Sequence, residues 1–253
     1  MKEVTNFSES RIKRMLLIIT LIYIFIFFIL NQDFINAATP SPPDVVNISS
    51  NTTKPAVSSK MINISGGYIA NVNITATTQN TRWKAFVGHV IGRFTLQDST
   101  GSQIYDWSLI TSTGRVYATR NSSSPVWTSI NCSNVTTLTE ENIKMEHTNP
   151  NDNLTATFNI TEGAIHGSFI SAGRLINNNT CPVLRTYVNN VSQNSNFTEV
   201  ALYDGVNIIY ASLLENDVTG YNGQKFDFQM IVPENGNSTW SGATAYYLYV
   251  ELD

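Results

Sequence analysis

The sequence predicts an all-β fold, a β-sandwich-like domain of the immunoglobulin-like or jelly-roll-like kind that follows one N-terminal hydrophobic helix. Apolar and polar residues alternate along residues 226–232 and again along 246–252, as in strands with one packed and one solvated face. Asp204-Gly205 and Asp98–Gly101 each separate two alternating runs, which is typical of hairpins. Residues beyond 60 show no long helical period.

One short helix is the exception. We expect it over residues 139–147, because Thr139 is suited to cap its N-terminus and two glutamates follow in the first turn. After residue 232, Pro233–Asn237 predicts a turn.

The N-terminus carries a basic tail and an apolar run. Four Lys and Arg residues occur in residues 1–14, and Met15–Leu30 contains no charge and would form a helix about 24 Å long. The positive-inside rule places a tail of residues 1–14 in the cytoplasm and everything after Leu30 outside. Residues 15–37 are then a transmembrane anchor or a signal peptide cleaved near Ala37-Ala38, so the chain contacts the membrane through residues 15–30 or is secreted.

Two regions follow. Residues 38–60 are rich in Pro, Ser, Thr and Asn, which predicts an extended stalk. Residues 61–253 form the predicted ectodomain. The hairpin motifs near residues 94–105 and 200–210 are similar to each other, so the ectodomain is either one β-sandwich or one built from two similar halves.

The outer part of the chain is dense in N-glycosylation acceptors. Only 13% of the 253 residues are charged, and the polar surface is supplied by Asn, Ser and Thr. Composition alone predicts about six N-x-Ser/Thr motifs after residue 37, roughly half the number present. The predicted acceptors are Asn47, Asn51, Asn63, Asn73, Asn121, Asn131, Asn134, Asn153, Asn159, Asn178, Asn190, Asn196 and Asn237.

The two cysteines, Cys132 and Cys181, both follow the hydrophobic segment. In an oxidising compartment two thiols usually pair, so we expect a disulfide. A reactive or metal-binding pair is the alternative, but no CxxC spacing or clustered His accompanies them.

We find no signature of catalysis. The chain lacks a GxSxG elbow, a Walker loop and an HExxH motif, and we expect no catalytic residue, no cofactor and no metal site at His89, His147 or His166. Two patterns stay open. Glu215, Asn216 and Asp217 offer oxygen ligands for structural calcium. A dispersed acid pair for hydrolysis could come from five carboxylates: Asp98, Asp106, Glu199, Asp204 and Asp227.

The partners that the sequence favours are other surface proteins or glycans. A net charge of −4 without a basic stripe argues against nucleic acid. Tyr247 and Tyr249 fall on the same side of their predicted strand, so together they would form an aromatic strip for stacking on sugars or proteins if that side is exposed.

Three segments carry a resemblance: residues 83–107 (WKAFVGHVIGRFTLQDSTGSQIYDW), FDFQMIVPENG and YYLYVEL. In these the chain resembles uncharacterised archaeal cell-surface proteins with an N-terminal hydrophobic segment and an Asn/Thr-rich β exterior. The resemblance implies a surface location and no known activity. We therefore expect a cell-surface structural or interaction module, with a carbohydrate-binding module as second and an extracellular hydrolase as third hypothesis.

Overall fold

The computed structural model describes residues 39–158, 165–237, 239 and 241–253. The predicted cytoplasmic tail and the 15–37 segment lie outside the described residues. Within the described ranges, no helix has both the length and the apolarity that crossing a bilayer requires. Contacts divide the chain after Ala37, and the unit that begins at Ala38 is the one described below.

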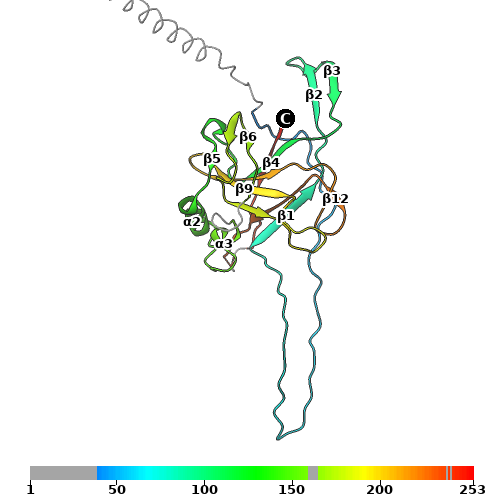
Figure 1. The fold of residues 1–253 in the computed structure, drawn as a ribbon, viewed down its shortest axis with the longest axis vertical. Helices are drawn as coiled ribbons and strands as arrows, with labels where there is room; N and C mark the ends of the chain where they lie inside the picture. Colours follow the sequence, from blue (N-terminus) through cyan, green and yellow to red (C-terminus); the bar gives the residue numbers. More distant parts are fainter. Residues whose placement is uncertain (1–38, 159–164, 238, 240) are drawn as a thin grey trace, which may run out of the picture. The chain divides into compact units, whose positions relative to one another are not determined.

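The described unit is an all-β fold with little helix, organised around one sheet (Figure 1). Its strands follow the order β14-β4-β10-β9-β5, and β8 also pairs with β9; every one of these pairings is antiparallel. The bounds are β4 (Gly114–Thr119), β5 (Asn131–Cys132), β8 (Val183–Arg185), β9 (Thr198–Tyr203), β10 (Ile208–Leu213) and β14 (Tyr247–Leu252).

The three central strands of this sheet are buried on both faces. Alternate residues of β10 show this, since Ile209 and Ala211 belong to one apolar core while Ile208 and Tyr210 belong to another. Side chains alternate across a strand, so the sheet separates two cores. It therefore needs a cover on each side.

The first cover consists of short segments. Trp127 of the 3-10 turn η1 (Trp127–Ser129) packs its ring against Tyr117 and Tyr249, with ring centroids 5.2 and 5.3 Å away. The hairpin of β6 (Phe169–Ser171) and β7 (Arg174–Ile176) adds Phe169 and Ile176 to the same core.

The second cover combines helices and a two-stranded ribbon. Helices α2 (Val135–Lys144) and α3 (Leu154–Thr157) supply Leu138 and Leu154, and β13 (Phe228–Pro233) supplies Met230 and Val232. Strand β13 pairs along its whole length with β1 (Trp83–Gly88). A small ribbon of β11 (Val218–Thr219) and β12 (Lys225–Phe226) precedes β13.

Side chains, not backbone pairing, fasten β13 to the central sheet. Glu199 and Ser212 are cross-strand partners on β9 and β10. The Glu199 carboxyl group accepts a hydrogen bond from the Ile231 N–H at 2.9 Å, and the Ser212 hydroxyl donates to the Gln229 carbonyl at 3.1 Å. These two bonds satisfy backbone groups on the edge of β13 that β1 does not reach.

The predicted disulfide is present, and it joins the ends of two short strands. Strands β5 and β8 run in the same direction along one edge of β9, with Cys132 opposite Leu202 and Val183 opposite Val200. The gap between them is closed by Cys132–Cys181, whose Cα atoms lie 4.7 Å apart. Two segments about fifty residues apart thus act as one edge strand.

The last strand differs from its prediction. Alternation in 246–252 indicated one solvated face, but Tyr249 and Glu251 are both buried. Glu251 accepts hydrogen bonds from the Tyr117 hydroxyl and, at 3.0 and 3.1 Å, from the Ala172 N–H. Burial raises the pKa of Glu251 in spite of these bonds. A polar pattern on this strand therefore marks a buried network and not a solvated face.

The helix and the turn also differ. Helix α2 begins at Val135, four residues before the expected start, because Asn134 and not Thr139 caps it through a bond from the Thr137 N–H at 3.0 Å. The turn after Pro233 does not join paired strands, since β13 pairs with β1 and β14 pairs with β4.

Replacing Glu199 by Gln tests the buried connection between the sheets. Burial raises the pKa of Glu199 well above its ordinary value of 4.5, so the folded state binds this proton more tightly than the unfolded state. The contribution of Glu199 is full below the unfolded pKa and is lost as the pH rises towards the folded pKa, by up to about 1.4 kcal/mol per pH unit. We expect E199Q to lack this decline, so that the stability of E199Q relative to the native chain rises as the pH is raised from about 4 to about 8.

Urea denaturation of both chains at intervals between roughly pH 4 and pH 8 measures the difference. Glu140→Gln, at an exposed position on the same cover, is the control and should leave the pH dependence unchanged. An E199Q chain that is destabilised equally at every pH would contradict the argument.

Candidate functional site

The β2–β3 hairpin stands apart from both cores. Strand β2 (Arg93–Gln97) pairs with β3 (Gln103–Ser108), and in the described structure these two strands form a sheet of their own (Figure 1). The Asp98 carboxylate shapes the turn by accepting from the N–H groups of Thr100 and Ser102 at 2.8 and 2.9 Å. Bonds from the Thr100 hydroxyl and from these backbone groups hold the pKa of Asp98 below its ordinary value.

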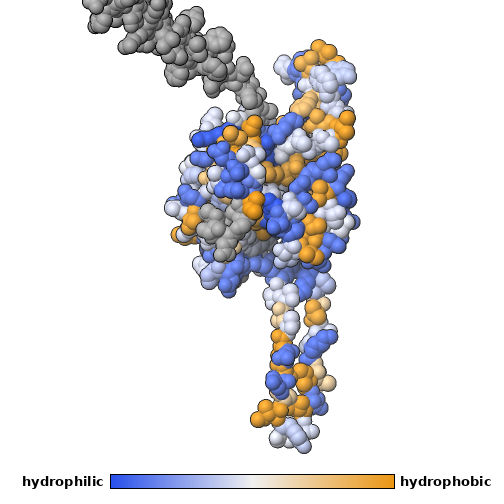
Figure 2. Space-filling view, viewed as in Figure 1, coloured by the Kyte–Doolittle hydropathy of each residue, from blue (hydrophilic) through white to orange (hydrophobic). Residues whose placement is uncertain are grey.

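One face of this hairpin is apolar and open to solvent. Phe94 lies opposite Trp107 and Leu96 opposite Tyr105, so the four side chains share a face. Their exposed fractions are 43% for Phe94, 49% for Trp107, 54% for Leu96 and 58% for Tyr105. We call these four residues the hairpin face. Figure 2 shows hydrophobic surface on this projecting hairpin.

The other face and the tip of the hairpin are mainly polar. Arg93 and Asp106 form an ion pair at 3.3 Å, and the tip consists of Asp98–Gln103, with no apolar side chain. A two-stranded hairpin alone is marginally stable in water, and contiguous exposed apolar surface usually marks a binding site. The hairpin face is therefore the candidate functional site.

A second exposed feature precedes β1. Ser41 pairs with Val250 of β14, and residues 42–81, which we call the arm, then leave the domain and return to Trp83 (Figure 1). Most of the predicted stalk lies in the arm, and so do residues 61–80, which form no strand. The two legs touch where Lys54 reaches the side chain of Gln79 and the carbonyl of Thr77.

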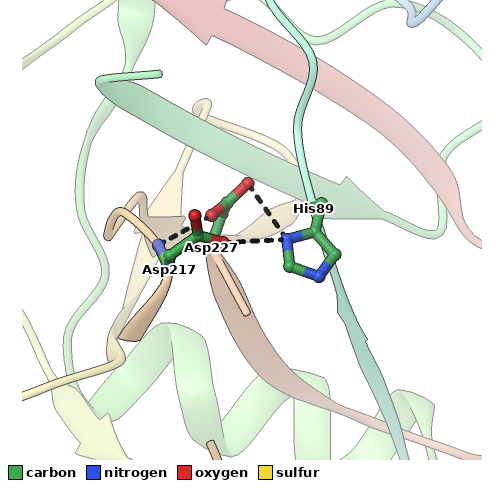
Figure 3. Close-up of side chains that lie close together, drawn as sticks. All are labelled: His89, Asp217 and Asp227. Carbon is green, nitrogen blue, oxygen red and sulfur yellow. Dashed lines mark hydrogen bonds and ion pairs between the residues drawn. The ribbon is translucent and has the colours of Figure 1, made fainter. Parts of the chain in front are cut away.

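A cluster of His89, Asp217 and Asp227 has the ligand types of a metal site (Figure 3). The His89 Nδ1 atom lies 3.6 Å from a carboxylate oxygen of each aspartate. However, Asp227 already accepts from the N–H groups of Val90 at 2.8 Å and Asp217 at 3.1 Å. It thereby fastens the segment after β1 to the loop before β11, which explains the cluster without an ion.

The other predicted ligands and carboxylates have local roles. Glu215 accepts from the Phe197 N–H at 3.0 Å, and Asn216 is exposed. Asp204 accepts from Val206 and Asn207 in the β9–β10 turn, a loop of four residues and not the two that the sequence predicted. The buried His166 ring accepts from the N–H groups of Thr180 and Cys181, both at 3.0 Å. The buried His147 contacts the Glu234 carbonyl at 2.5 Å.

The predicted aromatic strip does not form. Tyr247 is partly exposed, but Tyr249 packs against Trp127 and is only 6% exposed, because this side of β14 faces the first cover. The exposed aromatic pair is Tyr105 and Trp107, whose ring centroids lie 4.8 Å apart with the rings tilted by 57°. Two residues apart on one strand, they were detectable as an alternating pair, but nothing in the pattern distinguished an exposed hairpin from a packed one.

The acceptor asparagines lie at the surface. Asn159 lies outside the described residues, and every other predicted acceptor is exposed or half-buried. In five of them the side-chain oxygen accepts a nearby backbone N–H, and this bond does not use the amide nitrogen, the atom to which an N-linked glycan is attached. These five are Asn121, Asn131, Asn134, Asn153 and Asn237.

Comparison of the chain with protein-family profiles, with curated proteins and with solved structures gave no match.

Asp227→Ala separates a structural role of the cluster from a metal-binding one. Removing this carboxylate leaves two backbone N–H groups without their acceptor, which should cost about 2–4 kcal/mol of stability. His89→Ala, at a half-exposed ring, should cost less than about 0.5 kcal/mol. Urea denaturation with and without EDTA measures both. Equal losses in the two variants, accompanied by destabilisation of the native chain in EDTA, would indicate a bound cation instead.

Proposed function

We propose that this chain is a cell-surface structural or interaction module, displayed outside the membrane by residues 15–37 and N-glycosylated, which binds another protein through the hairpin face. The observation that carries the proposal is the exposed hairpin face itself, with four large apolar side chains on two strands that pack against neither core. Aromatic residues are enriched at protein interfaces, and a few buried Trp and Tyr anchors supply most of the binding energy there.

Three further observations support the extracytoplasmic part of the proposal. The disulfide requires an oxidising environment to persist. The described acceptor asparagines avoid the buried positions. The basic-then-apolar N-terminus orients the domain outward, as in the archaeal surface proteins that the chain resembles. We further propose that the ribbon of β1 and β13 and the central sheet are the two layers of a β-sandwich, since Met230 and Val232 pack onto the central sheet.

Carbohydrate binding is the second candidate, and the hairpin aromatics are its only new support. Sugars stack on flat aromatic platforms, whereas the Tyr105 and Trp107 rings are tilted by 57° to each other. A small polar pocket lined by Thr119, Arg120, Asn121, Glu141, Asn207 and Ile208 contains no aromatic residue. Within it Arg120 already pairs with Glu141 at 2.7 Å. The geometry therefore favours a protein partner.

Intact mass spectrometry of the full chain from its native membrane tests the compartment. We expect a mass that falls on enzymatic or chemical removal of glycans and a two-hydrogen deficit for Cys132–Cys181. The same mass shows whether the N-terminal segment is retained, as in an anchor, or missing, as after cleavage of a signal peptide. An unglycosylated chain with free thiols would overturn the proposed location.

Replacing Phe94 and Trp107 together by Thr tests the hairpin face. Threonine keeps strand propensity, and the pair packs into neither core, so the melting temperature should stay within a few degrees. Losing two aromatic anchors should weaken the association of the chain with its protein partner at least tenfold. Cross-linking in the native membrane and sedimentation of the detergent-solubilised full chain measure this association. Leu175→Thr, at an exposed apolar position of β7, is the matched control. Unchanged association in the double variant would refute a role for this face.

A further inference from the structure

The arm contains a segment with the pattern of a strand but no partner. Along residues 70–77, Ala70, Val72, Ile74 and Ala76 alternate with Asn71, Asn73, Thr75 and Thr77. A period of two with apolar and β-branched residues is typical of a half-buried strand. Yet Val72 and Ile74 are exposed, and Figure 2 shows hydrophobic residues along the arm. We call residues 70–77 the donor segment.

The backbone of this segment is open as well. In residues 42–80, all of which are described, the only hydrogen bond between backbone groups joins the Tyr68 N–H to the Ser65 carbonyl. Apart from the Thr77 carbonyl, which accepts from the Lys54 side chain, the donor segment therefore presents N–H and C=O groups that no other described backbone group pairs with. Such an edge is a template for pairing with another strand.

The β2–β3 hairpin also has strand edges without a hydrogen-bonding partner among the described residues. In the described structure β2 pairs with β3 alone, so each has an unpaired outer edge. Neither strand contains Pro or Lys, the two charged residues Arg93 and Asp106 pair with each other, and the register shift lies near the tip, between Leu96 and Gln97. A third strand would convert a marginal two-stranded ribbon into a stable sheet.

The arm and the hairpin leave the domain at opposite ends of β1. The arm enters at Trp83, and the chain reaches β2 only after Gly88 and the four residues that follow. Six residues of extended strand measure about 20 Å, so β1 separates the two features (Figure 1). If the arm of one molecule binds the hairpin of a second, the hairpin of the first and the arm of the second remain free. Each can bind a further molecule, so such heterologous contacts produce a chain of copies.

We propose that the donor segment of one copy pairs, as an added strand, with an open edge of the β2–β3 hairpin in a neighbouring copy. This inference rests on the proposed function and identifies the partner as a second copy of this chain. The apolar side of the donor segment then continues the hairpin face, placing Val72 or Ile74 beside Leu96 or Trp107. Asn73 falls on the opposite side, so a glycan there does not obstruct the pairing.

The hairpin tip argues against a lipid surface as the occupant. Insertion into a membrane would lead with Asp98–Gln103, and the low pKa of Asp98 keeps its carboxylate charged. A strand added along the edge leaves this tip in water.

Cysteine cross-linking of full chains in the membrane tests the pairing. One chain carries Val72→Cys and a second, distinguishable by an epitope tag, carries Leu96→Cys. A bismaleimide that spans about 10 Å, two strand spacings, reaches Leu96 from a donor on either edge. We expect the mixed dimer to form at least fivefold more than with Val57→Cys, an exposed apolar position on the other leg of the arm. A chain with both V72C and L96C should give a ladder of oligomers.

Three results would overturn the inference. They are cross-links only between two L96C chains, cross-links only within one V72C/L96C chain, and no V72C cross-link while association still depends on Phe94 and Trp107. In each of these the proposed function survives with a different partner or geometry. If the double Thr variant associates normally, the proposed function itself fails, whatever the cross-links show.

Discussion

The burial of the central sheet on both faces is the constraint on which the rest of the structure depends. Strands β4, β9 and β10 can hide neither face from water by themselves, so segments distant in the chain must be recruited to each side. The helices, the 3-10 turn and the ribbon of β1 and β13 are short because each has only to cover part of a face. Hydrophobic burial, and not local propensity, holds these elements in place.

Polar residues inside this arrangement supply its specificity. Glu199 accepts a hydrogen bond from one backbone N–H of β13, and Glu251 accepts hydrogen bonds from the Tyr117 hydroxyl and the Ala172 N–H. Arg115 at the end of the same sheet is held by a two-point ion pair with Asp253, at 2.7 and 2.9 Å. A shifted register would leave such groups buried without partners, which is costly. These contacts therefore favour one register of each cover on the sheet.

The turns and the hydrogen bonds within them could be predicted from the sequence, whereas the burial or exposure of each element could not. Both aspartate hairpins were expected and both form, with Asp98 and Asp204 accepting backbone N–H groups in their turns. Yet one hairpin lies at the centre of the fold and the other lies in solvent, because this difference depends on what packs against them. For the same reason Tyr249 was predicted as a binding residue and lies in a core. Asn134 is predicted as a glycan acceptor, and its role as the cap of α2 was missed because the short helix was expected to begin elsewhere.

The end-to-end alignment of β5 and β8 has a consequence for how such chains diversify. An edge strand that would otherwise be continuous is interrupted, and residues 133–180 are inserted at the interruption as a loop closed by a covalent bond. The entropy of closing a loop changes slowly with its length. Insertions or deletions within this cassette should therefore leave the sheet edge intact, provided that Leu138, Leu154 and Phe169 keep their places in the two cores. The cassette is a natural grafting point for new surface loops.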